Sequence, residues 1–331
     1  MEPSLRDRLI RSFSEPNTDP AHYDALFLEL FAYQYEHNIP YQRLCDARGA
    51  TPATATRWQE IPPVPAAAFK HMVLSCAPEA DCPVVFHSSG TTGAETSKHF
   101  MDADAVEIYR ASLRTGWALP SELPIVALMP SVQEAPHSSL SFMAEALGAQ
   151  FVWGEPLPRF SEPIVLSATA LAFVNLFDAG DVSPLPDGSY VVETGGFKGR
   201  SREVSREELY ALFTTHFGVP ESRCLSEYGM SEMASQFYSV GLNGPKLGPP
   251  WLHTRALDPV TGTDAKPGEP GLLAHWDLAN TNSCLALQTE DLGIMHPDGG
   301  FTLLGRAPGA ILRGCSLTAE EPLLPRSRFS N

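Results

Sequence analysis

The sequence predicts a mixed α/β protein with a mostly parallel sheet, flanking helices and a smaller antiparallel β region. Up to about residue 240, apolar runs typical of buried strands alternate with segments of helical periodicity. This alternation favours parallel pairing with helices on the sheet faces. Beyond that point, Gly, Pro and short alternating runs dominate, which favours antiparallel strands. With 331 residues, 43% of them hydrophobic, the chain can form one large domain or two ordinary ones.

The N-terminal part is expected to contain an amphipathic helix over residues 20–37, where apolar side chains recur at helical spacing. Asp19 can cap this helix. Pro20 suits its first position, because the N–H that proline lacks would have no helical partner there. The proline-stiffened stretch 60–70 is then expected to run extended into the main sheet.

Apolar runs are expected to form the buried strands of the main sheet. They lie at 83–86 (PVVF), 124–129 (PIVALM), 149–153 (AQFVW) and 190–194 (YVVET). Helices are expected at 138–147 and 205–217, and each stops before a glycine. The second opens with a capping box, Ser205 to Glu208. Antiparallel strands are expected later, at 271–277, 284–289 and 300–304.

These elements suggest four segments along the chain. An N-terminal helical segment packed on the core is expected over 1–80, followed by an α/β core over 81–240. A β-rich subdomain is expected over 241–305, and a short C-terminal tail carrying Cys315 over 306–331.

The charge and cysteine content exclude several classes of protein. The formal net charge is −16, and such a surface repels phosphate backbones, so nucleic-acid binding is not expected. A nucleotide can still bind locally through backbone N–H groups. The six cysteines form no CxxC or zinc-like spacing, which favours reduced, mostly buried thiols. The charged N-terminus does not resemble a signal peptide, and no apolar run approaches the roughly 20 residues of a membrane span, so we expect a cytoplasmic protein.

A loop rich in hydroxyl groups and glycine follows the first apolar run. Its residues are Ser88, Ser89, Gly90, Thr91, Thr92 and Gly93. Glycines let a backbone approach an anion closely, and hydroxyls donate hydrogen bonds to phosphate oxygens. Lys98 can add a point charge at the far end. On composition alone, however, an ordinary Ser/Gly turn is the commoner outcome. The sequence contains no Walker loop, dinucleotide fingerprint, G-x-S-x-G elbow or H-E-x-x-H motif.

Further motifs follow in a definite order. They are TGG at 194–196, EYGMSE at 227–232, GEPGLL at 268–273, TED at 289–291 and GR at 305–306. Together with SSGTTG, this series resembles the adenylate-forming superfamily, which includes acyl-CoA synthetases, luciferases and peptide-synthetase adenylation domains. The resemblance covers roughly residues 80–315. It implies that the chain uses ATP and Mg²⁺ to activate a carboxylic acid.

The resemblance also assigns roles to individual residues. It implies that SSGTTG binds the phosphates of ATP, and that Gly195 and Gly196 lie against adenine. Tyr228, followed by Gly229, would pack on the same ring. Ser231 would meet phosphate and Glu232 would hold Mg²⁺, an ion that prefers hard carboxylate oxygen. Asp291 would accept hydrogen bonds from the ribose, and Arg306 would reach the ribose or phosphate.

Other stretches resemble one branch of that superfamily, the LuxE-type acyl-protein synthetases. They are IPPVPAAAFK, ETGGFKGRSREVSREELY and LRGCSL. That family activates a fatty acid with ATP and moves the acyl group to a cysteine near its C-terminus, from which a partner reductase takes it. The matching thiol here is Cys315. Arg313 lies two residues away and favours the thiolate, although an idle or buried cysteine is the commoner outcome for a thiol taken alone.

The chain departs from the full superfamily at its C-terminal end. The superfamily carries a C-terminal domain with a catalytic lysine, whereas 25 residues follow Arg306 here and no lysine follows Lys266. We therefore expect the full C-terminal domain to be missing. Lys98 and His99, which directly follow the loop, are candidates to replace that lysine, and a companion protein is another.

Three functions stay open at this point. The first is acyl-adenylate formation followed by thioester formation on Cys315 or on a partner, with an acyl reductase or acyl carrier as the partner protein. The second is a ligase that delivers the acyl group to coenzyme A or a carrier protein, because phenylacetate-CoA ligase-like proteins share these motifs. The third is a catalytically silent nucleotide-binding subunit, which the presence of Tyr228, Glu232, Asp291 and Arg306 disfavours.

Overall fold

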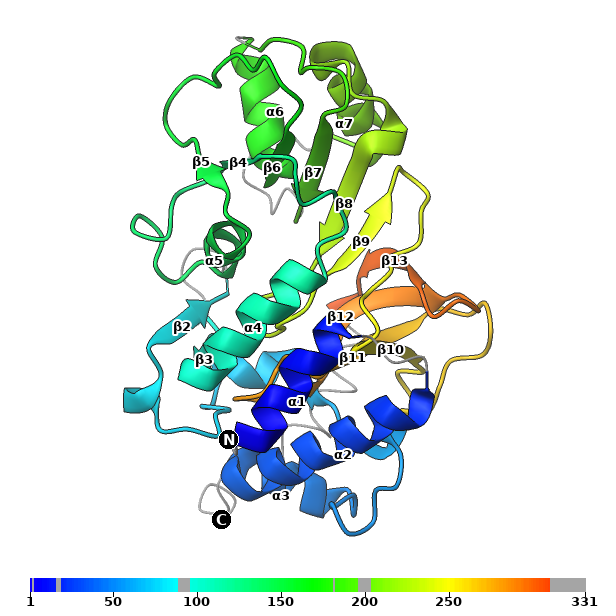
Figure 1. Cartoon of the computed structure of the whole chain (residues 1–331). Helices are drawn as coiled ribbons and strands as arrows, with labels where there is room; N and C mark the ends of the chain where they lie inside the picture. The colour runs from blue at the N-terminus through cyan, green and yellow to red at the C-terminus, as the bar shows by residue number, and fades with distance from the viewer. Residues whose placement is uncertain (2, 16–18, 89–95, 181, 196–203, 310–331) are drawn as a thin grey trace. The chain divides into compact units, whose positions relative to one another are not determined.

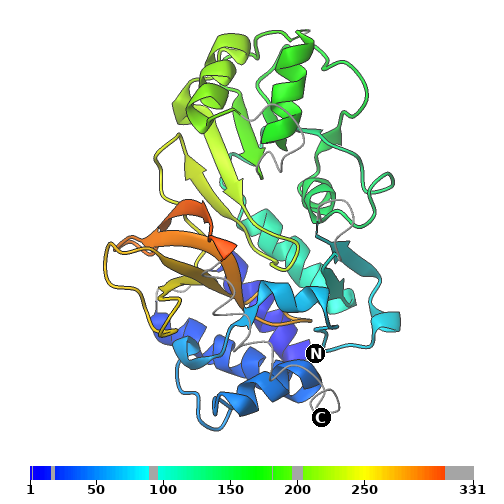
Figure 2. The same ribbon diagram turned by 180° about the vertical axis from the view of Figure 1, so that it is seen from behind.

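The structure is a computed structural model in which residues 1, 3–15, 19–88, 96–180, 182–195 and 204–309 are described. The chain forms two compact units (Figures 1 and 2). The first unit contains Met1–Thr115, Ser231–Ser235 and Gly248–Asn331, and the second contains Gly116–Met230 and Gln236–Leu247. The four segments expected from the sequence remain a prediction.

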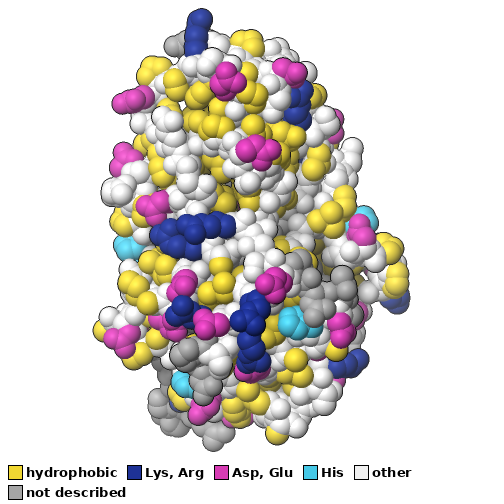
Figure 3. Space-filling model, in the orientation of Figure 1, with side chains coloured by type: hydrophobic (Ala, Val, Ile, Leu, Met, Phe, Trp, Pro, Cys, Tyr) yellow, Lys and Arg dark blue, Asp and Glu magenta, His cyan; other side chains and the backbone are white. Residues whose placement is uncertain are grey.

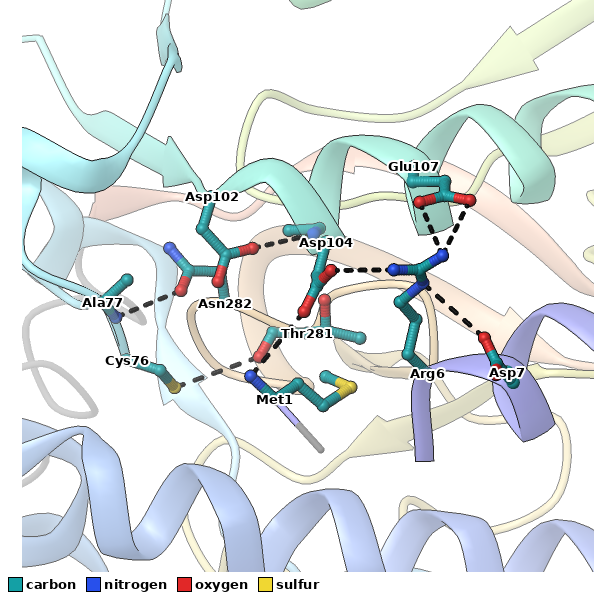
Figure 4. A network of polar contacts seen from close by, with 11 residues as sticks. Met1, Arg6, Asp7, Cys76, Ala77, Asp102, Asp104, Glu107, Thr281 and Asn282 are labelled. Atoms are coloured by element: carbon teal, nitrogen blue, oxygen red, sulfur yellow. Dashed lines mark hydrogen bonds and ion pairs between the residues drawn. The ribbon is translucent and has the colours of Figure 1, made fainter. Parts of the chain in front are cut away.

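Helices of the first unit include α1 (Pro3–Ser14), α2 (Pro20–His37), α3 (Ile39–Ala47) and α4 (Ala103–Thr115). The prediction for α2 is confirmed in both bounds, and the Asp19 side chain accepts a hydrogen bond from the Ala21 N–H at 3.0 Å. The other three helices were not predicted. α1 lies along α4, where Arg6 donates to Asp104 at 3.2 Å (Figures 1 and 4).

The sheet of the first unit confirms the antiparallel β region. Its strands run in the order β1 (Val64–Pro65), β12 (Ala286–Met295), β11 (Gly271–Asp277) and β10 (Leu252–Leu257), and β13 (Phe301–Arg306) pairs with β12. All pairs are antiparallel except β1 with β12. The prediction of an extended stretch at 60–70 is wrong beyond Pro65, because Ala66–Lys70 forms a 3₁₀ turn. No proline follows Pro65 in this stretch, so the later N–H groups are available for turn hydrogen bonds.

The strand expected at 83–86 does not join the main sheet. β2 (Val84–His87) pairs with β3 (Lys98–Met101) in a two-stranded antiparallel sheet of the first unit, with His87 opposite Lys98. Parallel pairing needs a crossover of about a dozen residues or more, and β3 begins too soon after β2 for that. β3 was not predicted, because its sequence mixes a lysine and a histidine with apolar residues.

The second unit contains the mostly parallel sheet. Its strands run in the order β5 (Gln150–Phe151), β4 (Ile125–Leu128), β6 (Val165–Thr169), β7 (Tyr190–Thr194), β8 (Cys224–Tyr228) and β9 (Phe237–Val240). Only β9 pairs antiparallel. The expected strands at 124–129, 149–153 and 190–194 are confirmed, the second in shortened form. β6 and β8 were missed, because polar residues interrupt their apolar runs.

Helices pack on the faces of this sheet, and they include α5 (Ser139–Ala146), α6 (Ala170–Ala179) and α7 (Arg206–Leu212). The Ser205 side chain caps α7, and residues Phe213–Phe217 continue it as a π-helix, so the helix expected at 205–217 is confirmed with a wider last turn. α6 and α7 bury one sheet face around Phe173 and Phe213. The other face is buried by Trp117 and Leu119, against Val165, Val192 and Leu225.

The surface mixes side chains of different kinds. Acidic, basic and apolar side chains are interspersed over the face drawn in Figure 3. Within the part of the chain that the structure describes, no helix combines the length and the apolar content needed to cross a membrane.

The core of the first unit contains histidines that titrate far from their usual range. His99 is 2% exposed and His275 is fully buried. Burial lowers the pKa of His99 to about 4 and that of His275 to about 3. The unfolded chain therefore binds more protons than the folded chain between these values and the ordinary pKa of about 6.5. Stability from each histidine is complete above about pH 6.5 and is lost as the pH falls.

We predict that replacing His99 with Leu removes part of this pH dependence. Between pH 7 and pH 4, the unfolding free energy of the wild type should fall by about 3 kcal/mol relative to His99→Leu, because only the wild type must keep a buried imidazole neutral. Urea unfolding of both proteins at several pH values measures the difference. If the difference in unfolding free energy between the two proteins stays constant with pH, the result would contradict the burial of a neutral His99 ring.

Candidate functional site

The base of the SSGTTG loop is closed by Ser88 and Ser97, both in the first unit. The Ser88 N–H donates to the Ser97 carbonyl at 3.1 Å, and the Ser97 N–H donates to Ser88 Oγ at 3.0 Å. The first bond joins the two backbones just beyond the β2–β3 ladder, and the second joins a backbone N–H to a side chain. Ser89, Gly90, Thr91, Thr92 and Gly93 lie outside the described residues.

The same hairpin contacts the EYGMSE motif. Ser97 Oγ donates a hydrogen bond to the carboxylate of Glu232, 135 residues further along the chain. Ser231 Oγ donates to the His87 carbonyl at 3.4 Å. All four residues belong to the first unit. Two motifs that the sequence could only place in order therefore lie together in space.

The Glu232 carboxylate lies in a mostly buried environment with positive charges near it. Burial raises its pKa, while the Ser97 hydrogen bond and the charges of Lys70 and Arg306 lower it. Among the described residues, no three His, Cys, Asp or Glu side chains gather as a metal cage. A single hard carboxylate suits Mg²⁺, which commonly takes its other ligands from phosphate and water. The donor set therefore fits the ion that the sequence analysis expected.

Lys98 and His99 point to opposite faces of β3, as neighbouring residues of a strand must. Lys98 is exposed, whereas His99 is buried and stacks on Phe69 with ring centroids 6.0 Å apart. Its low pKa keeps the imidazole neutral at physiological pH. Lys98 is therefore the stronger candidate for a charge donor. Lys70 is a second exposed lysine, which the sequence analysis missed although it ends the stretch AAAFK.

Asp291 and Arg306 are direct neighbours on β12 and β13 of the first unit. They are register partners, and Arg306 Nε lies 3.4 Å from Asp291 Oδ1. Arg306 also donates to the carboxylate of Glu290. The Arg306 side chain is 73% exposed and that of Asp291 14% exposed. The two residues that the resemblance assigns to the ribose region thus form one ion-paired group.

The remaining expected residues end two strands of the second unit. Gly195 follows β7 directly with φ +67°, a conformation that favours glycine, while Gly196 lies outside the described residues. Tyr228 ends β8, and its ring centroid lies 5.9 Å from that of Phe237. Gly229 follows. Because β7 and β8 are parallel neighbours, Gly195 and Tyr228 lie at the same edge of the sheet.

Comparisons with known proteins identify the family. A family model described as acyl-protein synthetase, LuxE, matches residues 140–324, which is more than half of the chain. The chain belongs to the LuxE acyl-protein synthetase family.

Two curated relatives are called long-chain-fatty-acid–luciferin-component ligase. The protein from Vibrio harveyi is 24% identical over 152 residues, or 43% of this chain and 39% of the relative. That from Aliivibrio fischeri is 24% identical over 142 residues, or 40% of this chain and 37% of the relative. The chain thus spans about two fifths of the length of the curated relatives that it matches.

Solved structures support the fold. A 2-hydroxyisobutyryl-CoA ligase in the postadenylation state, in complex with 2-HIB-AMP, matches with a TM-score of 0.64 at 16% identity and covers 87% of this chain and 69% of its own. The same ligase with 2-HIB-AMP and CoA in the thioesterification state matches with a TM-score of 0.64 at 17% identity, over 87% and 69%. At such identity the likeness concerns the fold alone. It confirms the mixed α/β core expected from the sequence.

The thiol that the LuxE resemblance points to, Cys315, lies outside the described residues. The five cysteines that the structure describes are free thiols, at positions 45, 76, 82, 224 and 284. Burial raises the pKa of each of them, to about 12 for Cys45 and Cys224. Each is thus held as a neutral thiol, which is a poor nucleophile.

A buried polar loop between β11 and β12 supports the segment that carries Glu232. The Asp277 carboxylate accepts from the Ala234 N–H at 2.9 Å, from Ser235 Oγ at 2.7 Å and from the Ala279 N–H at 3.0 Å. Asn280 Nδ2 donates to the Glu232 carbonyl at 2.8 Å. The sequence analysis missed this support, although the polar run DLANTNSC interrupting an apolar stretch was a usable signal.

This loop is fixed in turn by the segment before β2 (Figure 4). The Ala77 N–H donates to Asn282 Oδ1 at 3.1 Å, and the Cys76 thiol donates to the Thr281 carbonyl at 3.9 Å. Asp102 accepts from the Ala105 N–H at 2.8 Å and so caps α4 in the same view. The backbone at Glu232 is therefore held by a series of hydrogen bonds within the first unit, through the β11–β12 loop and the segment before β2.

We predict that Asp277→Ala destabilises the protein by on the order of 3 kcal/mol, because two backbone N–H groups and a hydroxyl lose their buried acceptor. The matched change is Asp264→Ala, which removes an exposed carboxylate that pairs with Arg255. An exposed ion pair contributes below about 1 kcal/mol. Urea unfolding at pH 7 measures both effects, and equal losses would contradict the support described for Glu232.

Proposed function

We propose that this chain activates a carboxylic acid with ATP as an acyl-adenylate and then transfers the acyl group to a thiol. Membership of the LuxE family supports the proposal. The observation that carries it is the contact of the SSGTTG hairpin with Ser231 and Glu232 in the first unit. The names of the curated relatives support a long-chain fatty acid as the substrate.

In the proposed first step, a carboxylate oxygen of the acid attacks the α-phosphorus of ATP. The bond from that phosphorus to the bridging oxygen breaks, and pyrophosphate leaves. The residues of this chain position the phosphates and balance their charge, because this step gains most from preorganised electrostatics. SSGTTG would donate hydrogen bonds, Lys98 and Arg306 would add positive charge, and Glu232 would hold Mg²⁺. When bound, the ion would neutralise phosphate charge.

The resemblance to the adenylate-forming superfamily suggests which residues would hold the nucleoside part of ATP. We assign the ribose to Asp291, whose carboxylate is oriented by Arg306. We assign adenine to Gly195 and Tyr228 at the ends of β7 and β8. Gly195 has no side chain and so leaves room for a flat ring, and the aromatic side chain of Tyr228 offers a surface for stacking.

In the proposed second step, a thiolate attacks the carbonyl carbon of the acyl-adenylate. A thioester forms, and AMP leaves. We assign the thiol to Cys315, because LRGCSL resembles the LuxE segment that carries the acylated cysteine, with a partner's thiol as the alternative. The raised pKa values of the five described thiols agree with this assignment. An acyl reductase or an acyl carrier protein would then take the acyl group.

We predict that Glu232→Gln lowers carboxylate-dependent ATP–pyrophosphate exchange by about 10²-fold, the typical cost of losing one charge-stabilising group. Exchange should also stop when EDTA removes Mg²⁺. The matched control is Glu36→Gln, an exposed glutamate on α2 of the same unit. A panel of saturated fatty acids and short acids serves as substrate. Full exchange in Glu232→Gln would refute the assigned role, and no exchange in the wild type with any acid would refute the proposed function.

We predict that Cys315→Ser keeps exchange activity and loses a hydroxylamine-sensitive acyl label. Cys76→Ser, at the most exposed of the described thiols, should keep both. Intact mass spectrometry after incubation with ATP and acid measures the label. A label that survives in Cys315→Ser contradicts self-acylation. Transfer to free coenzyme A that is undiminished in Cys315→Ser would instead identify the chain as an acyl-CoA ligase.

A further inference from the structure

A buried carboxylate joins the ends of β7 and β8 in the second unit. Thr194 and Glu227 are the last register partners of these two strands. Thr194 Oγ1 donates a hydrogen bond to Glu227 Oε2, and both residues are less than a tenth exposed. Side chains of paired residues in parallel strands share a face, so this bond adds a clamp to the backbone ladder at the place where it ends.

The other oxygen of the same carboxylate lies over the bend that follows β8. A Cβ atom added at Gly229 would lie 2.5 Å from Glu227 Oε1, closer than real contacts allow. A side chain at position 229 would therefore force the Glu227 carboxylate to shift. Glu227 thus bonds to the residue just before Gly195 and lies against the residue just after Tyr228.

Burial raises the pKa of Glu227 to about 7, and a cation of the same unit offsets this effect only in part. Lys246 is 4% exposed, and its Nζ donates to the Ser226 carbonyl and to Ser226 Oγ, each at 2.7 Å. Its charge acts on both Glu227 and Glu193. Arg206 lies 3.7 Å from Glu193. Two carboxylates and two cations therefore surround the ends of β7 and β8.

Glu227 lies at the polar end of its sheet face. Val165, Val192 and Leu225 make this face apolar further back, whereas Thr169 and Thr194 occupy the same register row as Glu227. A buried acid in such surroundings costs free energy unless it is paired and hydrogen-bonded, so an apolar residue would stabilise the sheet at lower cost. On this face of β7 and β8, Glu227 belongs to the last register pair. The two strands continue from that pair into Gly195 and Tyr228, the residues assigned to adenine.

We propose that Glu227 is a positioning residue for the base of the bound nucleotide, and that it acts by holding Gly195 and Tyr228 at a fixed spacing. The inference rests on the proposed function, because that function assigns these two residues to adenine. Glu227 itself does not touch the nucleotide. Its loss should therefore weaken binding of the base and spare binding of the phosphates.

The test compares the affinities of the full chain for Mg·ATP and for Mg·inorganic triphosphate by calorimetry. Glu227→Ala should weaken ATP binding about tenfold, which corresponds to about 1.4 kcal/mol, and change triphosphate binding less than about twofold. Glu227→Gln should bind ATP like the wild type, because its amide oxygen can accept from Thr194. Glu162→Ala, at an exposed acid of the same unit, is the matched control and should change neither affinity.

Three results would overturn the inference. Equal weakening of ATP and triphosphate in Glu227→Ala would mean a general structural role. A Glu227→Gln variant as weak as Glu227→Ala would remove the hydrogen bond as the cause. If Glu227→Ala does not fold, Thr194→Val takes its place. A selective loss of ATP affinity in Thr194→Val supports the inference, and unchanged affinity refutes it.

ATP–pyrophosphate exchange by the wild type is measured in parallel, so that failure of the proposed function can be distinguished from failure of the positioning role of Glu227. A wild type that binds ATP but exchanges no pyrophosphate with any acid refutes the proposed function. The selectivity of the variants between ATP and triphosphate still decides the role of Glu227.

Discussion

The hydrogen bond from Ser97 to the Glu232 carboxylate is the interaction on which the candidate site of the first unit depends. It joins a hairpin near residue 90 to a segment 135 residues away, and it leaves the carboxylate buried but partnered. A buried carboxylate without partners would be neutralised or would destabilise the fold. The supporting contacts of Asp277 and Asn280 follow from the same need, because a fixed acid requires a fixed backbone.

Sequence reasoning reached the local features and missed the ones that depend on distant contacts. α2 and β7 were predicted in both bounds, because Asp19-Pro20 and an unbroken apolar run are local signals. β8 was missed, since CLSEY carries a serine and a glutamate whose partners, Lys246 and Thr194, lie far along the chain. The pairing of β2 was wrong for the related reason that a strand does not encode its partner.

The same division applies to the candidate site. The motifs located Ser231, Glu232, Asp291 and Arg306 as residues of interest, because each motif is a short run with a recognisable order. Nothing local distinguished Ser97 from other serines, and the polar run that begins at Asp277 did not show what that aspartate contacts. Their importance comes from what they contact, and those contacts exist only once β3, the 231–235 segment and the β11–β12 loop have been brought together.

The proposed function requires a chain of net charge −16 to bind a polyanion, so the charges near Glu232 must be balanced locally. Burial already raises the pKa of Glu232, and Lys70 and Arg306 offset this only in part. Triphosphate placed near this carboxylate would raise its pKa further, because like charges at short range disfavour the ionised form. Under the proposed function, Glu232 would hold a divalent cation, whose positive charge would offset that effect and favour the ionised carboxylate. Acidic groups elsewhere on the surface would matter little to this balance, since salt screens charges beyond about 10 Å.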